Sequence, residues 1–125
     1  MTNKLGNLAL DTWVEGHGDG TLLTSAVDGE PVARITSDGL DFGELLRYAR
    51  QTGGANLRKL TFHQRGEMLK ELAKYLMEHK KELYALSTAT GATRADSWVD
   101  IDGGISTLFV FSSKGRREMP NDYVY

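Results

Sequence analysis

Apolar side chains recur every three or four residues after Thr61, which is the spacing of one face of an α-helix. The apolar positions of this stretch, which Arg65 and Met68 join, are Leu69, Leu72, Ala73 and Leu76. The opposite side carries Glu67, Lys70, Glu71 and Lys74. The pattern pauses near Glu78-His79 and resumes at Leu83 and Leu86. We expect an amphipathic helix that is interrupted near residue 79.

A second helical pattern begins after residue 94 and has a wider apolar face. Its positions are Trp98, Ile101, Ile105, Leu108, Phe109 and Ser112. Gly103-Gly104 lies in the middle, at a cost of about 1 kcal/mol per glycine relative to alanine. Such glycines indicate that another backbone passes close to the helix. We expect the helix to end at Gly115 and Pro120.

Capping residues indicate where these helices begin. Thr61 with Gln64 has the spacing of a capping box, and Thr93 with Asp96 repeats it with aspartate in the third position. An earlier helix is expected after Ser37-Asp38, with Asp38 as its cap and Asp41 in its first turn. Its apolar side holds Leu40, Leu45, Leu46 and Ala49, and Gly53-Gly54 is expected to end it. Gly91 is expected to end the helix that follows residue 79.

Residues 10–36 lack helical spacing and indicate strands. Trp13-Val14, Thr21–Thr24 and Pro31–Ile35 are extended in pattern, and Asp28-Gly29 is a strong hairpin-turn pair. Residues 16–20, which hold three glycines, are interpreted as a hairpin loop. We therefore expect a two- or three-stranded antiparallel meander, with strands at about 10–36 and about four helices at about 39–117. The fold class is α+β and mostly helical.

Composition narrows the class of protein. The chain has 125 residues, 40% of them hydrophobic and 26% charged, which suits one folded domain. No apolar run reaches the roughly 18 residues of a membrane span, and the N-terminus lacks the pattern of a signal peptide. With no cysteine, no disulfide framework is possible, and a cytoplasmic location is expected. The net charge of −2 provides no attraction for nucleic acid.

Each candidate site for chemistry is better explained by a structural role of its residues. His63 with Glu67 and His79 with Glu82 are spaced to share helix faces, but a zinc site needs at least three converging ligands. Residues 16–20 lie between two extended segments, whereas phosphate-binding loops join a strand to a helix. We therefore expect no metal site and no phosphate loop.

Three carboxylates lie close together at Asp96, Asp100 and Asp102. We expect capping and solvation to explain them, with Asp100 as the one that could be buried. No serine lies in a nucleophile elbow. The aromatic residues Trp98, Phe109 and Phe111 could form a stacking set, although helical spacing favours a place in the core. The residues alone therefore indicate no catalytic, cofactor-binding or metal-binding residue.

Several of these segments resemble the N-terminal part of the aldehyde dehydrogenase superfamily. Arg65 to Leu69 matches an Arg-x-x-x-Leu pattern, and the helix that follows closes on Thr90-Gly91. Ala92 stands where many members have lysine, and Asp100 where many have glutamate. Those departures suit the phenylacetate-degradation branch of the superfamily, which the run from Thr90 to Asp100 resembles closely.

The resemblance implies a fragment of a larger enzyme fold. Members use a cysteine nucleophile, a glutamate base and a cofactor lysine that lie beyond this segment, so none is assigned to this chain. The complete protein would oxidise a CoA-linked semialdehyde with NAD or NADP. The implied partners are the remainder of the dehydrogenase chain and further copies in a homo-oligomer, with no nucleic acid or membrane. The helix at 95–115 would be clamped beneath the nucleotide-binding sheet and, alone, would expose apolar surface. The alternatives are a stand-alone helical module that binds a protein through its Trp98–Phe109 face and a small enzyme with an unrecognised site.

Overall fold

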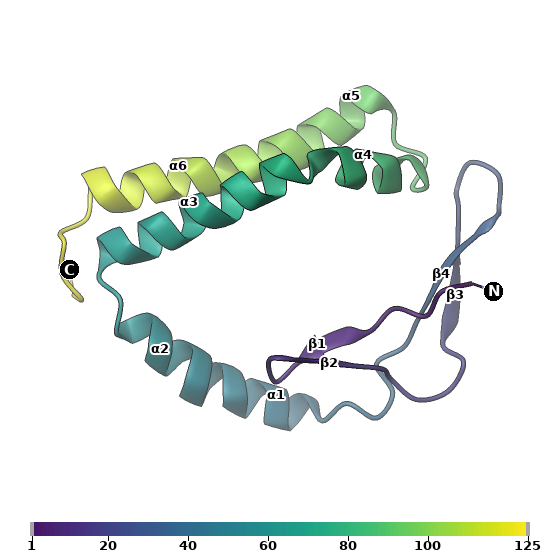
Figure 1. The fold of residues 1–125 in the computed structure, drawn as a ribbon, viewed down its shortest axis with the longest axis horizontal. Coiled ribbons are helices and arrows are strands. Elements are labelled where there is room, and N and C mark those ends of the chain that lie inside the picture. Colours follow the sequence, from purple (N-terminus) through teal and green to yellow (C-terminus); the bar gives the residue numbers. More distant parts are fainter. Residues whose placement is uncertain (1, 125) are drawn as a thin grey trace. The chain divides into compact units, whose positions relative to one another are not determined.

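The computed structural model describes residues 2–124 and places them in two compact units (Figure 1). The first unit runs up to Gly53 and includes Ala89–Gly91, and the second holds the remaining helices. The fold class is α+β and mostly helical, as expected. No helix of the described part is both long enough and apolar enough to cross a bilayer.

The first unit contains two separate hairpins instead of one meander. Strand β1 (Asn7–Ala9) pairs with β2 (Thr12–Val14), and β3 (Thr21–Thr24) pairs with β4 (Pro31–Ile35), both antiparallel. The expected Asp28-Gly29 turn is confirmed, since Gly29 has φ +75° and Ser25 N donates to Glu30 O at 2.8 Å. Residues 16–20 join the two hairpins, so their interpretation as a hairpin loop is wrong.

The sequence pattern did not predict β1 because the turn that joins β1 to β2 contains no glycine. Leu10 and Asp11, which join β1 to β2, both take positive φ values of 52° and 65°. A turn with two positive φ values matches the twist of a hairpin, but glycine and asparagine are its usual residues. Because leucine is not a usual residue of such a turn, the sequence pattern did not indicate one at this position.

The first helix begins later and continues further than expected. Helix α1 (Phe42–Tyr48) is capped by Asp41, whose Oδ1 accepts from Glu44 N at 2.9 Å, so Asp38 is not the cap. The chain stays helical through the π-helical segment η1 (Ala49–Gly53) and α2 (Gly54–Arg58). Gly53-Gly54 thus does not end the helix, because helical backbone tolerates glycine at a moderate energetic cost.

The second unit is built on an antiparallel pair of long helices, α3 (Phe62–Glu78) and α6 (Gly103–Arg117), which lie side by side (Figure 1). Both expected capping boxes are confirmed, at Thr61 for α3 and at Thr93 for α5 (Arg94–Ser97). Helix α4 (Lys80–Thr88) follows a break at His79, and η2 (Trp98–Asp102) joins α5 to α6 without leaving helical backbone. Gly91, with φ +82°, lies in the turn after α4.

Small residues let α3 and α6 approach each other closely. Ala73, Ile105 and Ser112 are at most 3% exposed, and Gly66 is also buried. A Cβ added to Gly66 would lie 3.0 Å from Ser112 O, and one added to Gly115 would lie 3.8 Å from Gly66 Cα. Gly115 therefore belongs to the helix interface, and α6 continues past it to Arg117.

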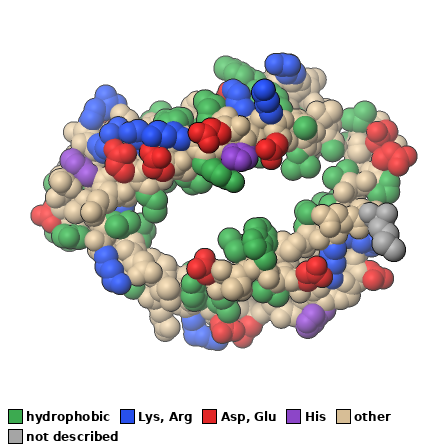
Figure 2. Space-filling view, in the orientation of Figure 1, with side chains coloured by type: hydrophobic (Ala, Val, Ile, Leu, Met, Phe, Trp, Pro, Cys, Tyr) green, Lys and Arg blue, Asp and Glu red, His purple; other side chains and the backbone are tan. Residues whose placement is uncertain are grey.

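The expected close approach at Gly103-Gly104 is not found among the described residues. No atom of residues 2–124 lies within 4 Å of a Cβ added at either glycine, apart from the neighbouring residues and the helix's own backbone. The expectation of exposed apolar surface is confirmed. Val99 is 61% exposed, Val110 50% and Phe111 59%, and Figure 2 shows hydrophobic side chains among the charged ones on the surface.

Candidate functional site

One carboxylate of the helical unit is held by two donors from a neighbouring helix. Asp102, at the end of η2, accepts from Lys80 Nζ at 2.5 Å and from Tyr84 Oη at 2.5 Å, one on each oxygen. The Asp102 side chain is only 14% exposed. Lys80 and Tyr84 are four residues apart on α4, so they share one face of that helix. We call these three residues the Asp102 clamp.

The clamp shifts the pKa values of Asp102 and Tyr84 in opposite directions. Hydrogen bonds from Lys80 and Tyr84 lower the pKa of Asp102 below its ordinary value of 3.8. Donation to that carboxylate raises the pKa of Tyr84 above 10.0, because the phenolate would lose the bond and face a like charge. At neutral pH Asp102 is therefore a carboxylate and Tyr84 a neutral phenol.

The sequence pattern favours solvation or capping for Asp102 and allows burial for Asp100, and the structure reverses the two. Asp100 is exposed, whereas Asp102 is the paired and largely covered acid. The π-helical turn at 98–102 shifts the helical register, so a wheel drawn at 3.6 residues per turn misplaces both. The sequence feature that could have indicated a paired carboxylate is the four-residue spacing of its two donors, Lys80 and Tyr84.

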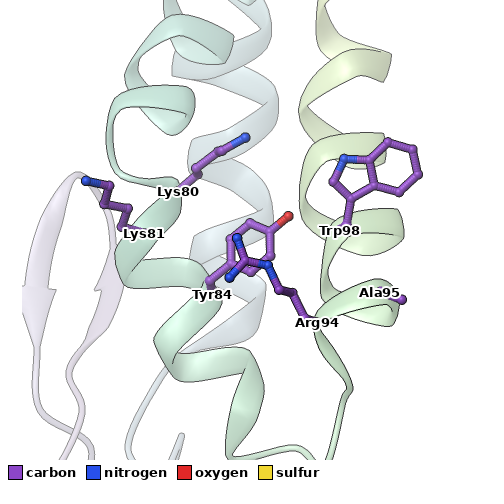
Figure 3. A pocket seen from close by; sticks show the side chains of 6 residues that line it. All are labelled: Lys80, Lys81, Tyr84, Arg94, Ala95 and Trp98. Carbon is purple, nitrogen blue, oxygen red and sulfur yellow. The ribbon is translucent and has the colours of Figure 1, made fainter.

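An open hollow of about 930 Å³ lies beside the clamp. Its walls come from α4 on one side and from α5 and η2 on the other (Figure 3). Its lining residues are Lys80, Lys81, Tyr84, Arg94, Ala95 and Trp98. Among residues 2–124, neither Lys81 nor Arg94 forms an ion pair. The Trp98 residue is 61% exposed, so it is a wall of this hollow and not part of the core.

The two histidine–glutamate pairs do not form metal sites. His63 Nε2 donates to Met119 O at 3.0 Å, and Glu67 instead pairs with Arg116 at 2.7 Å. His79 stacks on Tyr75 with ring centroids 4.2 Å apart. Within the described range, no three histidine, aspartate or glutamate side chains are grouped as a metal ion would require.

The glycine-containing segment at 16–20 presents carbonyl oxygens where a phosphate loop presents N–H groups. Lys4 Nζ donates to Gly16 O at 2.5 Å and to Gly18 O at 2.7 Å. Carbonyl oxygens that surround an ammonium would repel a phosphate. This segment therefore does not fit a dinucleotide cofactor.

The remaining candidate residues either have a structural role or lie apart from one another. Asp96 serves the cap of α5, where hydrogen bonds from the Thr93 side chain and backbone lower the pKa of its carboxyl. Trp98 and Phe111 line different hollows, so they do not form one stacking set. No thiol is present anywhere in the chain. The chain therefore lacks the thiol nucleophile of the resembled superfamily.

The two small antiparallel hairpins and the long helical pair with its capping boxes define an α+β fold, in a chain that contains no thiol. The chain belongs to the aldehyde dehydrogenase family, whose model matches residues 13–123. It is 38% identical over 114 residues to 3,4-dehydroadipyl-CoA semialdehyde dehydrogenase from Aromatoleum evansii. That match covers 90% of this chain and 22% of the relative, so the chain spans about a fifth of the relative's length.

Proposed function

We propose that this chain is the N-terminal, non-catalytic segment of an NAD(P)-dependent aldehyde dehydrogenase that oxidises a CoA-linked semialdehyde to an acid. One observation carries the proposal: 90% of the chain matches a CoA semialdehyde dehydrogenase, yet only 22% of that protein is matched. The cysteine nucleophile of the superfamily has no counterpart among the 125 residues. The chemistry would therefore reside in sequence that this chain does not contain.

The role of the segment is then to scaffold the rest of the domain. The α3–α6 pair is closely packed at Gly66, Ser112 and Gly115, which makes it a stiff support. Val99, Val110 and Phe111 stay half or more exposed on the helix that the family resemblance places beneath the nucleotide-binding sheet. Covering such side chains stabilises an assembly by about 25 cal/mol per Å² of apolar area.

The proposed partners follow from this role. They are the remainder of the dehydrogenase chain and further copies in a homo-oligomer, in the cytoplasm. NAD or NADP would be bound by the remainder, since the segment at 16–20 does not fit a dinucleotide. The purified chain alone should sediment as a species heavier than its 13.8 kDa formula mass, because its exposed apolar side chains lack their usual cover.

A chimera tests the function directly. Residues 13–123 would replace the matched segment of the Aromatoleum evansii dehydrogenase, and NAD(P)H formation would be followed with an aldehyde substrate. We expect the chimera to be active and the isolated chain to be inactive. A matched chimera with Ile105→Asp should lose activity, because Ile105 is 3% exposed in the α3–α6 core.

The alternative, a stand-alone module that binds a protein through its Trp98–Phe109 face, predicts that the chimera has no dehydrogenase activity. A chimera that folds but forms no NAD(P)H would refute the dehydrogenase-segment proposal. A monomeric chain whose Val110→Lys variant is unchanged in sedimentation would refute the proposed cover of the apolar face.

A further inference from the structure

Strand β3 has one edge that no other part of the described chain pairs with. Its inner edge bonds to β4 in the hairpin shown in Figure 1. The far edge of β4 is occupied by the N-terminal segment, because Arg34 N donates to Asn3 O and Leu5 N donates to Arg34 O, both at 2.9 Å. The order across the hairpin is therefore residues 3–5, then β4, then β3 at the open side.

The strand register shows which backbone groups of β3 face outward. Leu22 lies opposite Arg34 in the antiparallel pair. The N–H and C=O of Arg34 bond to residues 3–5, so they point away from β3. In an antiparallel ladder the groups of the opposite residue then point away as well, so those of Leu22 face outward. Among residues 2–124, neither of these Leu22 groups has a backbone partner, so both are open to an incoming strand.

Open edges of this kind are usually protected. Natural proteins place lysine, proline or an inward-pointing charge on an edge strand, which prevents it from pairing with a further chain. Residues 20–27 contain no charged residue and no proline, and all four residues of β3 are exposed. The register shift at Leu23–Thr24 and the bond from Ala26 N to Ala89 O at 2.8 Å confine the open edge to the stretch around Leu22.

The uncharged run favours a second copy of this chain as the partner. Two copies of β3 can pair antiparallel about a two-fold axis at Leu22, where the two leucines exchange both N–H···O bonds. Like charges close to such an axis would face each other and repel. The nearest charged residue of the strand, Asp19, would instead face Ser25 of the second copy. Arg34 directs its guanidinium to the carbonyl oxygens of Asp19 and Gly20, at 3.4 and 3.2 Å.

We propose that β3 joins two copies of this chain edge to edge, with Leu22 at the two-fold axis. This pairing names one surface of the homo-oligomer proposed above and rests on that part of the proposed function alone. It requires neither dehydrogenase activity nor association through α6. A ladder this short buries little area, so the isolated chains should pair weakly and in a concentration-dependent way.

Hydrogen exchange of single amides in the purified 125-residue chain tests the pairing. The Leu22 N–H should be protected at a chain concentration of about 1 mM and should lose that protection on dilution to about 10 μM. The Leu23 N–H, on the β4 side of the strand, should stay protected at both concentrations and report that the hairpin is folded. A Leu22 amide that is unprotected at the higher concentration would refute the proposal. Protection that does not change on dilution would also refute it, because the chain would then cover its own edge.

Charge variants locate the axis. Leu22→Lys places two ammonium groups at the axis and should abolish the concentration-dependent protection of residue 22. Val32→Lys is the matched control: Val32 is 37% exposed and Leu22 38%, but Val32 lies on β4, away from the open edge, so protection should persist. Isotope-labelled Leu22→Lys chain mixed with unlabelled Leu22→Glu chain should regain protection, because opposite charges then meet. Failure of this rescue, or loss of protection in Val32→Lys, would overturn the proposal.

The exchange of this amide reports separately from the chimera test of the dehydrogenase proposal. An active chimera together with an unprotected Leu22 amide would refute the β3 pairing and leave the dehydrogenase proposal standing. An inactive chimera together with concentration-dependent protection of Leu22 would support the pairing and refute the dehydrogenase proposal.

Discussion

Gly66 and Gly115 lie opposite each other where α3 crosses α6, and a Cβ on Gly115 would be 3.8 Å from the Cα of Gly66. The contact brings the two backbones together without intervening side chains. On the same turn, Glu67 accepts from Arg116 Nη1 at 2.7 Å. The crossing is therefore closed by backbone contact and flanked by a charged hydrogen bond.

This relationship predicts opposite effects of alanine at two glycines. Gly66→Ala places a methyl group 3.0 Å from Ser112 O and 3.3 Å from Arg116 Cγ, so the helices must shift. Overpacking of this kind costs about 1–3 kcal/mol of unfolding free energy. Gly104→Ala meets nothing within 4 Å and should stabilise by about 1 kcal/mol. Urea unfolding of both variants checks the contrast, and an equal gain from both would contradict the close crossing.

The Asp102 clamp predicts how α4 responds to acid. The pKa of Asp102 is lowered in the folded state, so the unfolded state binds the proton more readily. The clamp's contribution is therefore complete above pH 3.8 and is lost as the pH falls through the lower folded pKa. The protection of the α4 amides, measured as their exchange rate relative to the intrinsic rate at each pH, should fall over that interval.

Asp102→Asn should make α4 exchange faster already at neutral pH and should remove the acid-dependent step. No residue of α4, all of which lies in the described range, is buried, so little apolar packing replaces the clamp. Asp100→Asn is the matched control, because Asp100 is exposed on the same turn. An Asp102→Asn chain with unchanged α4 exchange would show that the clamp does not hold this helix.

The cap of α3 predicts a second stability difference. Thr61 Oγ1 accepts from Gln64 N at 3.3 Å and donates to Asn121 Oδ1 at 2.8 Å. Thr61→Ala should therefore destabilise the chain by about 1 kcal/mol. Thr107→Ala removes only a bond from an exposed hydroxyl to Gly103 O and should be nearly neutral. Thermal unfolding measures the stability of both variants. Equal losses of stability would mean that the Thr61 cap contributes no more than the exposed Thr107 hydroxyl.

A buried hydroxyl predicts a stabilising substitution. Ser112 is 1% exposed, and its Oγ has no hydrogen-bond partner among the described residues. Ser112→Ala should raise the unfolding free energy by about 1 kcal/mol, because a buried polar group without a partner is unfavourable. Ser97→Ala is the contrast: Ser97 is 2% exposed, but its Oγ lies 2.9 Å from Ser87 Oγ, so its loss should destabilise. Denaturant unfolding decides between these signs.

Local patterns correctly predicted several caps, a helix break and one turn. The capping boxes at Thr61 and Thr93, the break at His79 and the Asp28-Gly29 turn depend on contacts within a few residues. Such contacts are encoded by neighbours in sequence and can be recognised without the fold. Capping at Asp41 instead of Asp38 and the helix through Gly53-Gly54 show the limit, since several weak signals competed there.

The candidate site was not predictable in the same way. Lys80 and Asp102 are 22 residues apart, and the π-helical turn before α6 decides which acid faces α4. Trp98 has the spacing of a core residue, yet it is 61% exposed, because helical spacing defines a face and not what covers it. The pairing of β1 with β2 was likewise hidden by an unusual turn at Leu10 and Asp11.

The sequence by itself determined the fold class, most helix boundaries, the absence of a cysteine nucleophile and the likeness to the aldehyde dehydrogenase family. Only the tertiary structure decided that glycines 66 and 115 face each other while Gly103-Gly104 face no other part of the described chain. It also decided that Asp102 is clamped and that Trp98 lies at an open hollow, 61% exposed, instead of in the core. The physical reason is range: caps and turns depend on adjacent residues, whereas burial and pairing depend on which distant segments pack together.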